Sequence, residues 1–271
     1  MDLSSPKIMG ILNITSDSFF AESRIAGAES LLHKVSEMLD EGVDILDIGG
    51  QSTRPGANDV GLEEELRRVI PSIELIRDAF PQAVISIDTY RAEVARQAVK
   101  AGANMVNDIS GGRLDEDMFR TVAQLQVPYV LMHIQGNPKN MQENPEYIDV
   151  VNDVFAELKL GIDTLLSLGV KDIILDPGFG FGKTVAQNYE MLLRLEEFKA
   201  LNCPLLVGIS RKSMVNKVLN VNAQEALNGT TFLHALALER SASILRVHDV
   251  KEAVECKQLM GYINDIRPNI V

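Results

Sequence analysis

The chain has 271 residues, 46% of them hydrophobic, and a formal net charge of −12 at pH 7. This length fits one large α/β barrel or two small domains. Because no linker rich in Ser, Gly or Pro separates two halves, we expect a single domain over residues 1–271. A general nucleic-acid binder carries the opposite charge, so we expect no nucleic-acid partner.

Neither targeting segments nor cysteine pairs are evident in the sequence. The N-terminal stretch lacks the charged-then-apolar pattern of a signal peptide, and no apolar run approaches the roughly 18 to 20 residues that a membrane span needs. Cys203 and Cys256 are the only cysteines. They are too few for a disulfide framework or a zinc site, so we expect two reduced thiols. We therefore expect a cytoplasmic protein without membrane contact.

Short apolar runs alternate with amphipathic stretches along the whole chain. The runs predict strands over 8–14, 43–48, 84–87, 105–109, 129–132, 173–175, 205–207 and 244–247. The stretches predict helices over 28–41, 62–80, 92–101, 118–125, 150–168, 189–199, 225–239 and 250–266. Eight such alternations are typical of a (β/α)8 TIM barrel. An open doubly wound sheet is the alternative, although it rarely needs eight units.

Polar residues interrupt or follow every apolar run. They are Asn13, Asp47, Asp88, Asn107, Asp108, His133, Asp176, Arg211, Lys212, Arg246 and His248. In a barrel of parallel strands the carboxyl ends of all strands meet at one face, which is where such enzymes keep their active sites. We therefore predict that these side chains converge on the C-terminal mouth of the barrel.

The segment 204–213, PLLVGISRKS, combines three features of an anion site. An apolar strand ends in Arg211 and Lys212, and burying two cations is costly unless an anion or an electron-rich ligand meets them. The following residues, 214–219, predict the start of a helix, whose backbone amides would point to the same place. This segment therefore predicts a site for a negatively charged substrate.

Two carboxylates and an amide end neighbouring predicted strands. Asp88, Asp176 and Asn107 would suit a flat heterocycle rich in N–H donors, because each carboxylate accepts strong, charge-assisted hydrogen bonds. The alternative is that the acids only neutralise Arg211 and Lys212. Both interpretations can hold together.

Two loops contain further motifs. Gly182-Lys183-Thr184 resembles the end of a phosphate-binding P-loop, but that pattern requires Gly at position 177, where the chain has Pro177. The glycines of 178–182 instead predict a tight turn that lets Phe181 reach the site. The polar segment 47–57, DIGGQSTRPGA, is long enough for a lid, with an ordinary connection as the alternative.

These motifs together resemble those of a known enzyme family. GILNITSDSFF, DIGGQSTRPGA, SIDT, NDISGG, MHIQGNP, LDPGFGFGK, GISRKS and RVHDV occur in the order and spacing of the dihydropteroate synthase family, from about Met9 to Asp249. The resemblance implies a barrel enzyme of folate synthesis. It would join 4-aminobenzoate to 7,8-dihydropterin-6-ylmethyl diphosphate and release pyrophosphate and 7,8-dihydropteroate. It also implies Mg²⁺, a homodimer, and a sulfonamide target.

The resemblance also implies roles for individual residues. The pterin would be held by Asp88, Asn107, Met132, Asp176, Gly208 and Lys212. The diphosphate would be bound by Asn13, Arg246 and His248, with Asn13 also contacting Mg²⁺. The 4-aminobenzoate would be framed by Thr53, Arg54, Pro55, Phe181, Lys212 and Ser213. The residues acting in catalysis would be Asp88, Lys212, Arg246 and His248, and the expected path is loss of diphosphate before attack by the amine.

The first loop departs from the family pattern. Ser16 stands where the family usually has proline, and 20–23 replace a glycine-rich end. Two other functions remain open at this point. A methyltetrahydrofolate methyltransferase would share the carboxylates and the amide but would bind neither diphosphate nor aminobenzoate, which the STRPG and SRKS segments argue against. A barrel that binds pterin without turnover is the second.

Overall fold

The computed structural model describes residues 2–14, 24–51, 60–136, 141 and 145–267. Its eight parallel strands are β1 Lys7–Asn13, β2 Ile45–Gly49, β3 Ile85–Asp88, β4 Met105–Asp108, β5 Tyr129–Met132, β6 Ile173–Asp176, β7 Leu206–Val207 and β8 Ile244–Val247. They form one sheet in the order β6-β5-β4-β3-β2-β1-β8-β7. A parallel bridge between Leu175 and Leu205 joins its two edge strands. The predicted barrel is confirmed, and the open sheet is wrong.

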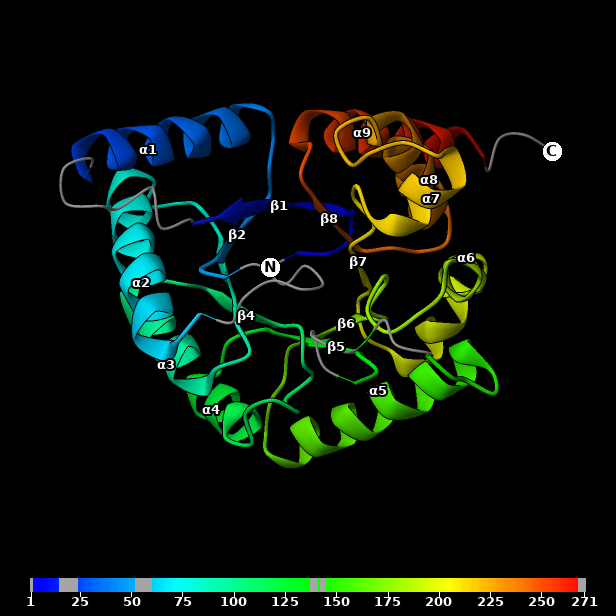
Figure 1. Ribbon diagram of the computed structural model, residues 1–271, viewed down its shortest axis with the longest axis horizontal. Helices are drawn as coiled ribbons and strands as arrows, with labels where there is room; N and C mark the ends of the chain where they lie inside the picture. The colour runs from blue at the N-terminus through cyan, green and yellow to red at the C-terminus, as the bar shows by residue number, and fades with distance from the viewer. Residues whose placement is uncertain (1, 15–23, 52–59, 137–140, 142–144, 268–271) are drawn as a thin grey trace.

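Helices surround the strands as an outer ring (Figure 1). They are α1 Arg24–Asp40, α2 Leu62–Ala79, α3 Ala92–Ala101, α4 Met118–Leu125, α5 Val150–Ser167, α6 Val185–Leu193, α7 Ser213–Leu219, α8 Leu227–Glu239 and α9 Val250–Ile266, with a 3-10 helix, η2, over Leu195–Leu201. Within the described part of the chain, none of the helices combines the length and apolar character that a membrane crossing requires.

The helix predicted over 189–199 has the wrong bounds. The α-helix begins at Val185, because Thr184 caps it and forms a reciprocal pair of hydrogen bonds with Gln187. The backbone then tightens into the 3-10 helix from Leu195. This capping pair was readable in the sequence, and it places the start of α6 directly after the 177–183 turn.

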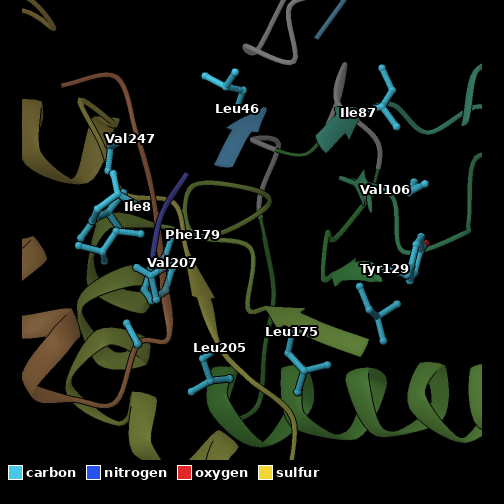
Figure 2. Packing of buried hydrophobic residues seen from close by; sticks show 14 of the residues in the cluster. Ile8, Leu46, Ile87, Val106, Tyr129, Leu175, Phe179, Leu205, Val207 and Val247 are labelled. Atoms are coloured by element: carbon cyan, nitrogen blue, oxygen red, sulfur yellow. The ribbon is translucent and has the colours of Figure 1, made fainter. Parts of the chain in front are cut away.

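The period of two along each strand divides the core into two layers. One set of buried side chains fills the barrel interior: Met9, Ile45, Met105, Val130, Ile174, Leu206 and Ile244. The alternate set packs between strands and helices, and Figure 2 shows Ile8, Leu46, Val106, Tyr129 and Leu175 among them. Successive side chains of a strand face opposite sides. Interior positions two residues beyond the first set therefore lie nearer the C-terminal mouth.

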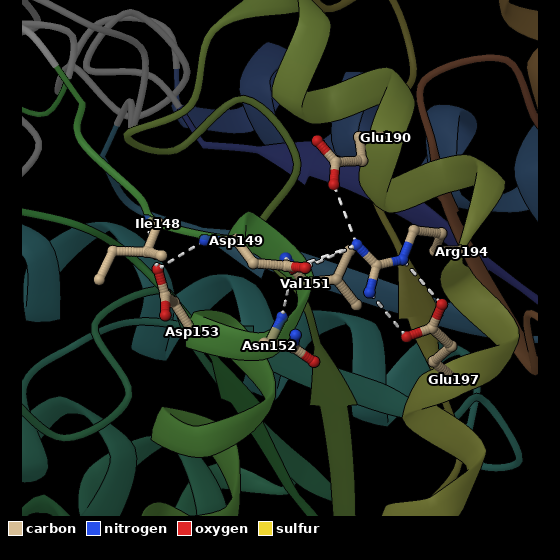
Figure 3. Close-up of polar contacts among 8 residues, drawn as sticks. All are labelled: Ile148, Asp149, Val151, Asn152, Asp153, Glu190, Arg194 and Glu197. Atoms are coloured by element: carbon tan, nitrogen blue, oxygen red, sulfur yellow. Dashed lines mark hydrogen bonds and ion pairs between the residues drawn. The ribbon is translucent and has the colours of Figure 1, made fainter.

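One ionic cluster connects α5 to α6 and η2 (Figure 3). Asp149 caps α5 by accepting from the backbone amides of Val151 and Asn152, at 3.0 and 2.9 Å. Arg194, at the end of α6, donates to Asp149 at 3.1 Å and to Glu197 at 2.7 Å. A cap and a shared guanidinium fix the two helices relative to each other. These are the helices that flank the 177–183 turn.

Candidate active site at the C-terminal mouth of the barrel

Arg246 of β8 lies at the centre of a buried polar cluster. Its Nε donates to Asp47 Oδ2 at 2.7 Å, and its Nη2 donates to Asp88 Oδ2 at 2.6 Å. Asn107 Nδ2 donates to the same Asp47 oxygen at 3.0 Å. Burial alone disfavours the guanidinium charge, but the two carboxylates outweigh this and raise the pKa of Arg246. Four strands, β2, β3, β4 and β8, thus contribute to one cluster.

Two carboxylate oxygens of this cluster remain available. Among the described residues, Asp47 Oδ1 and Asp88 Oδ1 are buried and have no hydrogen-bond partner. Buried oxygens of this kind are normally satisfied, so they indicate where a ligand with N–H groups would bind. Burial raises the pKa of Asp88 to about 7, although the Arg246 charge acts in the opposite direction, and Asp47 raises it further.

Lys212 forms the second cationic centre of the mouth. Its ammonium donates to the carbonyl of Phe179 at 2.5 Å and lies 4.6 Å from the centroid of the Phe181 ring. Burial lowers the pKa of Lys212 to about 8, and the nearby Asp176 opposes this. Burial also raises the pKa of Asp176, while Lys212 acts to lower it. Asp176 Oδ1 accepts from the backbone amide of Gly178 at 2.8 Å.

Apolar groups and a glycine complete the inner part of the mouth. Met132 and Phe181 are buried together with Ile109 and Ile134. A Cβ atom on Gly208 would meet nothing closer than 3.8 Å, where it would find Lys212 Nζ and the Arg246 side chain. Gly208 therefore leaves the space beside both cations open to a flat ligand.

Three predicted residues lie at the exposed rim. These are Asn13, His248 and Ser213, the first residue of α7. Asn13 Oδ1 and Asp88 Oδ2 are each 3.6 Å from the Cβ position of Gly49, so the rim and the buried cluster are adjacent. His248 Nδ1 lies 3.0 Å from Ser210 Oγ. Thr53, Arg54 and Pro55, with the atypical positions 16 and 20–23, lie outside the described residues.

Arg211 is not part of the mouth, contrary to the prediction for the 204–213 segment. Its Nε and Nη2 donate to Asp249 at 2.8 and 2.7 Å, and its Nη1 donates to the carbonyls of Ala223 and Gln224. Arg211 has a positive φ of 55°, so the chain turns between it and Lys212. Of the two adjacent cations, Lys212 alone faces the site.

Asp108 and His133 also lie away from the predicted convergence. Asp108 accepts from the hydroxyl of Tyr129 at 2.7 Å, a residue of the layer between strands and helices. His133 Nε2 lies 3.1 Å from Glu157 of α5. Each follows an inward-facing residue by one position, and the alternation of side chains turns it to the opposite face.

Two residues of the site received no specific role from the sequence, although Asp47 was among the side chains predicted to converge on the mouth. Asp47 is two positions beyond the interior residue Ile45, so the alternation along β2 places it in the Arg246 cluster. Lys183 follows the 178–182 glycines, and its buried ammonium contacts the turn that carries Phe181. The position of Asp47 at the end of a predicted strand indicated its place at the mouth, whereas nothing in the spacing indicated that Lys183 is buried there.

Residues 9–248 match the family described as "Pterin binding enzyme". The chain belongs to the dihydropteroate synthase family of pterin-binding enzymes. The dihydropteroate synthase of Escherichia coli K12 is 44% identical over 263 residues, which is 96% of this chain and 92% of that protein. The chain is therefore an enzyme, a transferase of folate biosynthesis.

Solved structures of the family agree with the fold. A crystal structure of the Yersinia pestis dihydropteroate synthase with a sulfonamide drug is 40% identical, with a TM-score of 0.91 and coverage of 98% of this chain and 96% of that one. The Xanthomonas albilineans dihydropteroate synthase with 4-aminobenzoic acid is 39% identical, with a TM-score of 0.88 and coverage of 97% and 94%. The chain thus belongs with the dihydropteroate synthases, and these comparisons do not support the methyltransferase alternative.

The raised pKa of Asp88 leads to a prediction about stability. An acid whose pKa is about 7 when folded and 3.8 when unfolded binds more protons in the folded chain, so it opposes folding increasingly as the pH rises between these values. Asp88→Asn removes this contribution. We expect the free energy of unfolding of the variant, relative to wild type, to rise by on the order of 2 kcal/mol between pH 5 and pH 7.

Denaturant titrations at a series of pH values measure this difference. Asp163→Asn, at an exposed position of α5, is the matched control for replacing a carboxylate by an amide. A difference between Asp88→Asn and wild type that stays constant across this range would contradict the expectation.

Proposed function

We propose that the chain condenses 7,8-dihydropterin-6-ylmethyl diphosphate with 4-aminobenzoate, giving 7,8-dihydropteroate and pyrophosphate. The observation that carries the proposal is the buried pair of unpartnered carboxylate oxygens beside two cations. The oxygens suit the N–H groups of a pterin, and the cations Arg246 and Lys212 suit an anionic leaving group. The family membership supports the same reaction.

The pterin would lie within the inner part of the mouth. Asp88, Asn107 and Asp176 would offer hydrogen bonds to its ring, while Lys212 would donate to a ring acceptor. Gly208 would leave space for one face of the ring, and Met132 would pack on it. We assign Asp47 to this group as well, because its Oδ1 is buried and without a partner among the described residues.

The diphosphate would lie at the rim near Asn13, Arg246 and His248. Among the described residues, Asn13 offers an amide oxygen for Mg²⁺ there, and Mg²⁺ commonly takes few protein ligands because phosphates and waters complete its octahedral shell. The donor set therefore fits. When bound, Mg²⁺ would neutralise charge on the diphosphate. Arg246 and His248 would hold its oxygens, and Arg246 needs no proton transfer to do so.

The 4-aminobenzoate would lie nearer the exposed rim of the mouth than the pterin. Phe181 offers an aromatic surface, with Lys212 on one of its faces, and Ser213 offers an exposed hydroxyl. Thr53, Arg54 and Pro55, outside the described residues, would complete this subsite, as the family resemblance implies. A sulfonamide presents a similar aniline, so we propose that sulfonamides compete at this position.

A dissociative path is consistent with these groups. The bond between the pterin methylene carbon and the diphosphate oxygen would break first, its electron pair leaving with the diphosphate. The electron-rich pterin would stabilise the positive charge on carbon. The amine nitrogen would then attack and lose a proton. The path needs charge neutralisation at the leaving group and exclusion of water, and no nucleophilic side chain.

Pyrophosphate release tests this function directly. Purified enzyme should release pyrophosphate rapidly when the pterin diphosphate, 4-aminobenzoate and Mg²⁺ are all present, and omission of Mg²⁺ should slow it. Release should be slow but measurable without the amine if ionisation precedes attack. Strict dependence on the amine would favour concerted displacement, and no release under any condition would leave only a binding role.

Calorimetry should separate the two substrate sites. Asp88→Ala and Asp176→Ala should each weaken pterin binding by at least about tenfold, because a buried N–H donor of the ligand loses its acceptor. Ser213→Ala should leave pterin affinity within about twofold and should weaken 4-aminobenzoate binding. Titrating a pterin and then 4-aminobenzoate into each variant measures both effects. Unchanged pterin affinity in both Asp variants would refute these assignments.

The outer surface of α7, α8 and α9 supports a homodimer. These helices lie together on one side of the barrel (Figure 1). They expose large apolar side chains: Val218, Leu219, Phe232, Leu259, Tyr262 and Ile263. An apolar surface of this kind commonly marks a contact with another protein chain. We propose that a second copy of the chain covers it.

Sedimentation should test the dimer. Wild type should sediment at twice the chain mass, and Phe232→Asp, which places a charge on this surface, should shift the equilibrium towards the monomer. Leu166→Asp, on the exposed side of α5, is the control and should leave the dimer intact. A wild-type monomer at all concentrations would contradict the proposal.

Cysteine chemistry supports a reducing compartment. Cys203 and Cys256 are free thiols, half-buried and buried respectively, and free thiols persist in the cytoplasm. We propose that location for the enzyme. Fractionation of the producing cells would test it, and recovery in an oxidising compartment would contradict it.

A further inference from the structure

The turn over residues 177–183 is packed against β5 and its continuation. Gly178 has a φ of 75°, and a Cβ atom there would lie 1.8 Å from the carbonyl oxygen of His133. A Cβ atom on Gly182 would lie 2.7 Å from the carbonyl oxygen of Gln135. The turn therefore follows the backbone of 133–135 closely, and side chains outside it satisfy several of its backbone groups, among them Asp176 and Asn188, which accept from the amides of Gly178 and Gly180.

Lys183 donates to two carbonyls of the turn from its inner side. Its ammonium, which is buried, lies 2.9 Å from each of three acceptors: the carbonyls of Gly178 and Phe181 and Nδ1 of His133. The charged form of Lys183 has three donors and all of them are used, although burial lowers the pKa of Lys183 to about 7 and the nearby Asp176 opposes this. The carbonyl of Phe181 is thereby held directly, and with it the backbone from which the Phe181 ring extends.

The other end of this arrangement lies on α5. Because His133 Nδ1 accepts from Lys183, its Nε2 carries the proton and faces Glu157 at 3.1 Å. Glu157 also pairs with Arg113. Burial lowers the pKa of His133 to about 4, so the ring is neutral near pH 7. Neutral His133 thus connects a buried cation to a carboxylate that is partly exposed.

Lys183 and Lys212 hold different parts of the same turn. Lys212 reaches the carbonyl of Phe179 from the β7 side, whereas Lys183 reaches the carbonyls on either side of it. The Lys212 ammonium borders the open space beside Gly208, where the proposed function places the pterin, but the Lys183 ammonium is fully occupied by protein groups. Lys183 can therefore act on the reaction only through the residues that it holds.

We propose that Lys183, oriented by His133 and Glu157, is a positioning residue that sets the pose of the Phe181 ring and so the affinity for the aromatic amine substrate. The inference rests on the proposed function, because it assumes that Phe181 packs on 4-aminobenzoate. It assigns a role to the motif Gly182-Lys183-Thr184, which resembles the end of a phosphate-binding loop but has Pro177 where that loop requires glycine.

Steady-state kinetics of the full-length enzyme test the proposal. Lys183→Met keeps the length of the side chain and removes the three hydrogen bonds. We expect the KM for 4-aminobenzoate to rise about tenfold, as for small misplacements near a reacting group, and the calorimetric Kd of the pterin to stay within about twofold. In a Phe181→Leu background the same substitution should change the KM by less than about twofold, because the two residues act as one unit.

A second pair of variants decides the matter if Lys183→Met does not fold. His133→Leu removes the acceptor for Lys183, and His133→Asn can retain one; we expect an increase in amine KM for the first and near wild-type behaviour for the second. Lys199→Met, at an exposed position of η2, is the control for the lost charge. A merely structural role would lower the folded fraction without this pattern.

Three results would overturn the proposal in an active wild-type enzyme. They are an unchanged amine KM in Lys183→Met and His133→Leu, an equal rise in the Phe181→Leu background, or an equal loss of pterin affinity. A wild-type enzyme that forms no dihydropteroate would instead refute the proposed function. The failures of the two ideas are thus distinguishable.

Discussion

The shared guanidinium of Arg246 is the interaction on which the rest of the site depends. Its two carboxylate partners come from β2 and β3, and Asp47 is 199 positions earlier in the sequence. Each of these charges would be costly to bury alone, and the loss of one partner from a buried pair typically costs about 3–5 kcal/mol. The ion pairs therefore require that the last strand of the sheet lies beside the first. The pairing of β1 with β8 therefore also brings the charged groups of the site together.

The charge balance of this cluster is suited to a ligand rich in hydrogen-bond donors. One cation faces two carboxylates, so the pair cannot be neutralised by Arg246 alone, and oxygens of both acids remain without a partner among the described residues. Lys212 and Asp176 form a similar pair of opposite charges elsewhere in the mouth. Burial lowers the pKa of Lys212 and raises the pKa of Asp176. A ligand that donates to the acids and accepts from the cations satisfies both halves.

The sequence was sufficient for the architecture because barrel strands are short and buried. The runs 129–132 and 244–247 and the helices over 92–101, 118–125 and 250–266 agree with the structure to the residue. Which polar residue faces the mouth was predicted less well. Asn107 and Asp108 are adjacent, and the alternation along β4 could have separated them, since Met105 faces the interior.

Other features depend on contacts that a sequence does not display. Arg211 and Lys212 diverge because the backbone at Arg211 adopts a positive φ, and no pattern of residue types announces it. Lys183 is buried because His133 and two carbonyls surround it, and these come together only in the folded turn. The incomplete phosphate-loop pattern includes this lysine, but the pattern does not indicate that the side chain is buried.

The junction between β6 and β7, the two edge strands of the sheet, is the part of the barrel with the least backbone pairing. Among the residues that the structure describes, the backbone pairing between these two strands is an isolated bridge of Leu175 and Leu205, with the amide of Leu175 donating to the carbonyl of Pro204. The other neighbouring strand pairs share longer ladders. A part of a fold that is joined by few hydrogen bonds needs less free energy to open locally than the rest. The hydrogen bond from Lys212 to the carbonyl of Phe179 crosses this junction, so a side chain that we propose to bind the pterin also helps to keep the barrel closed.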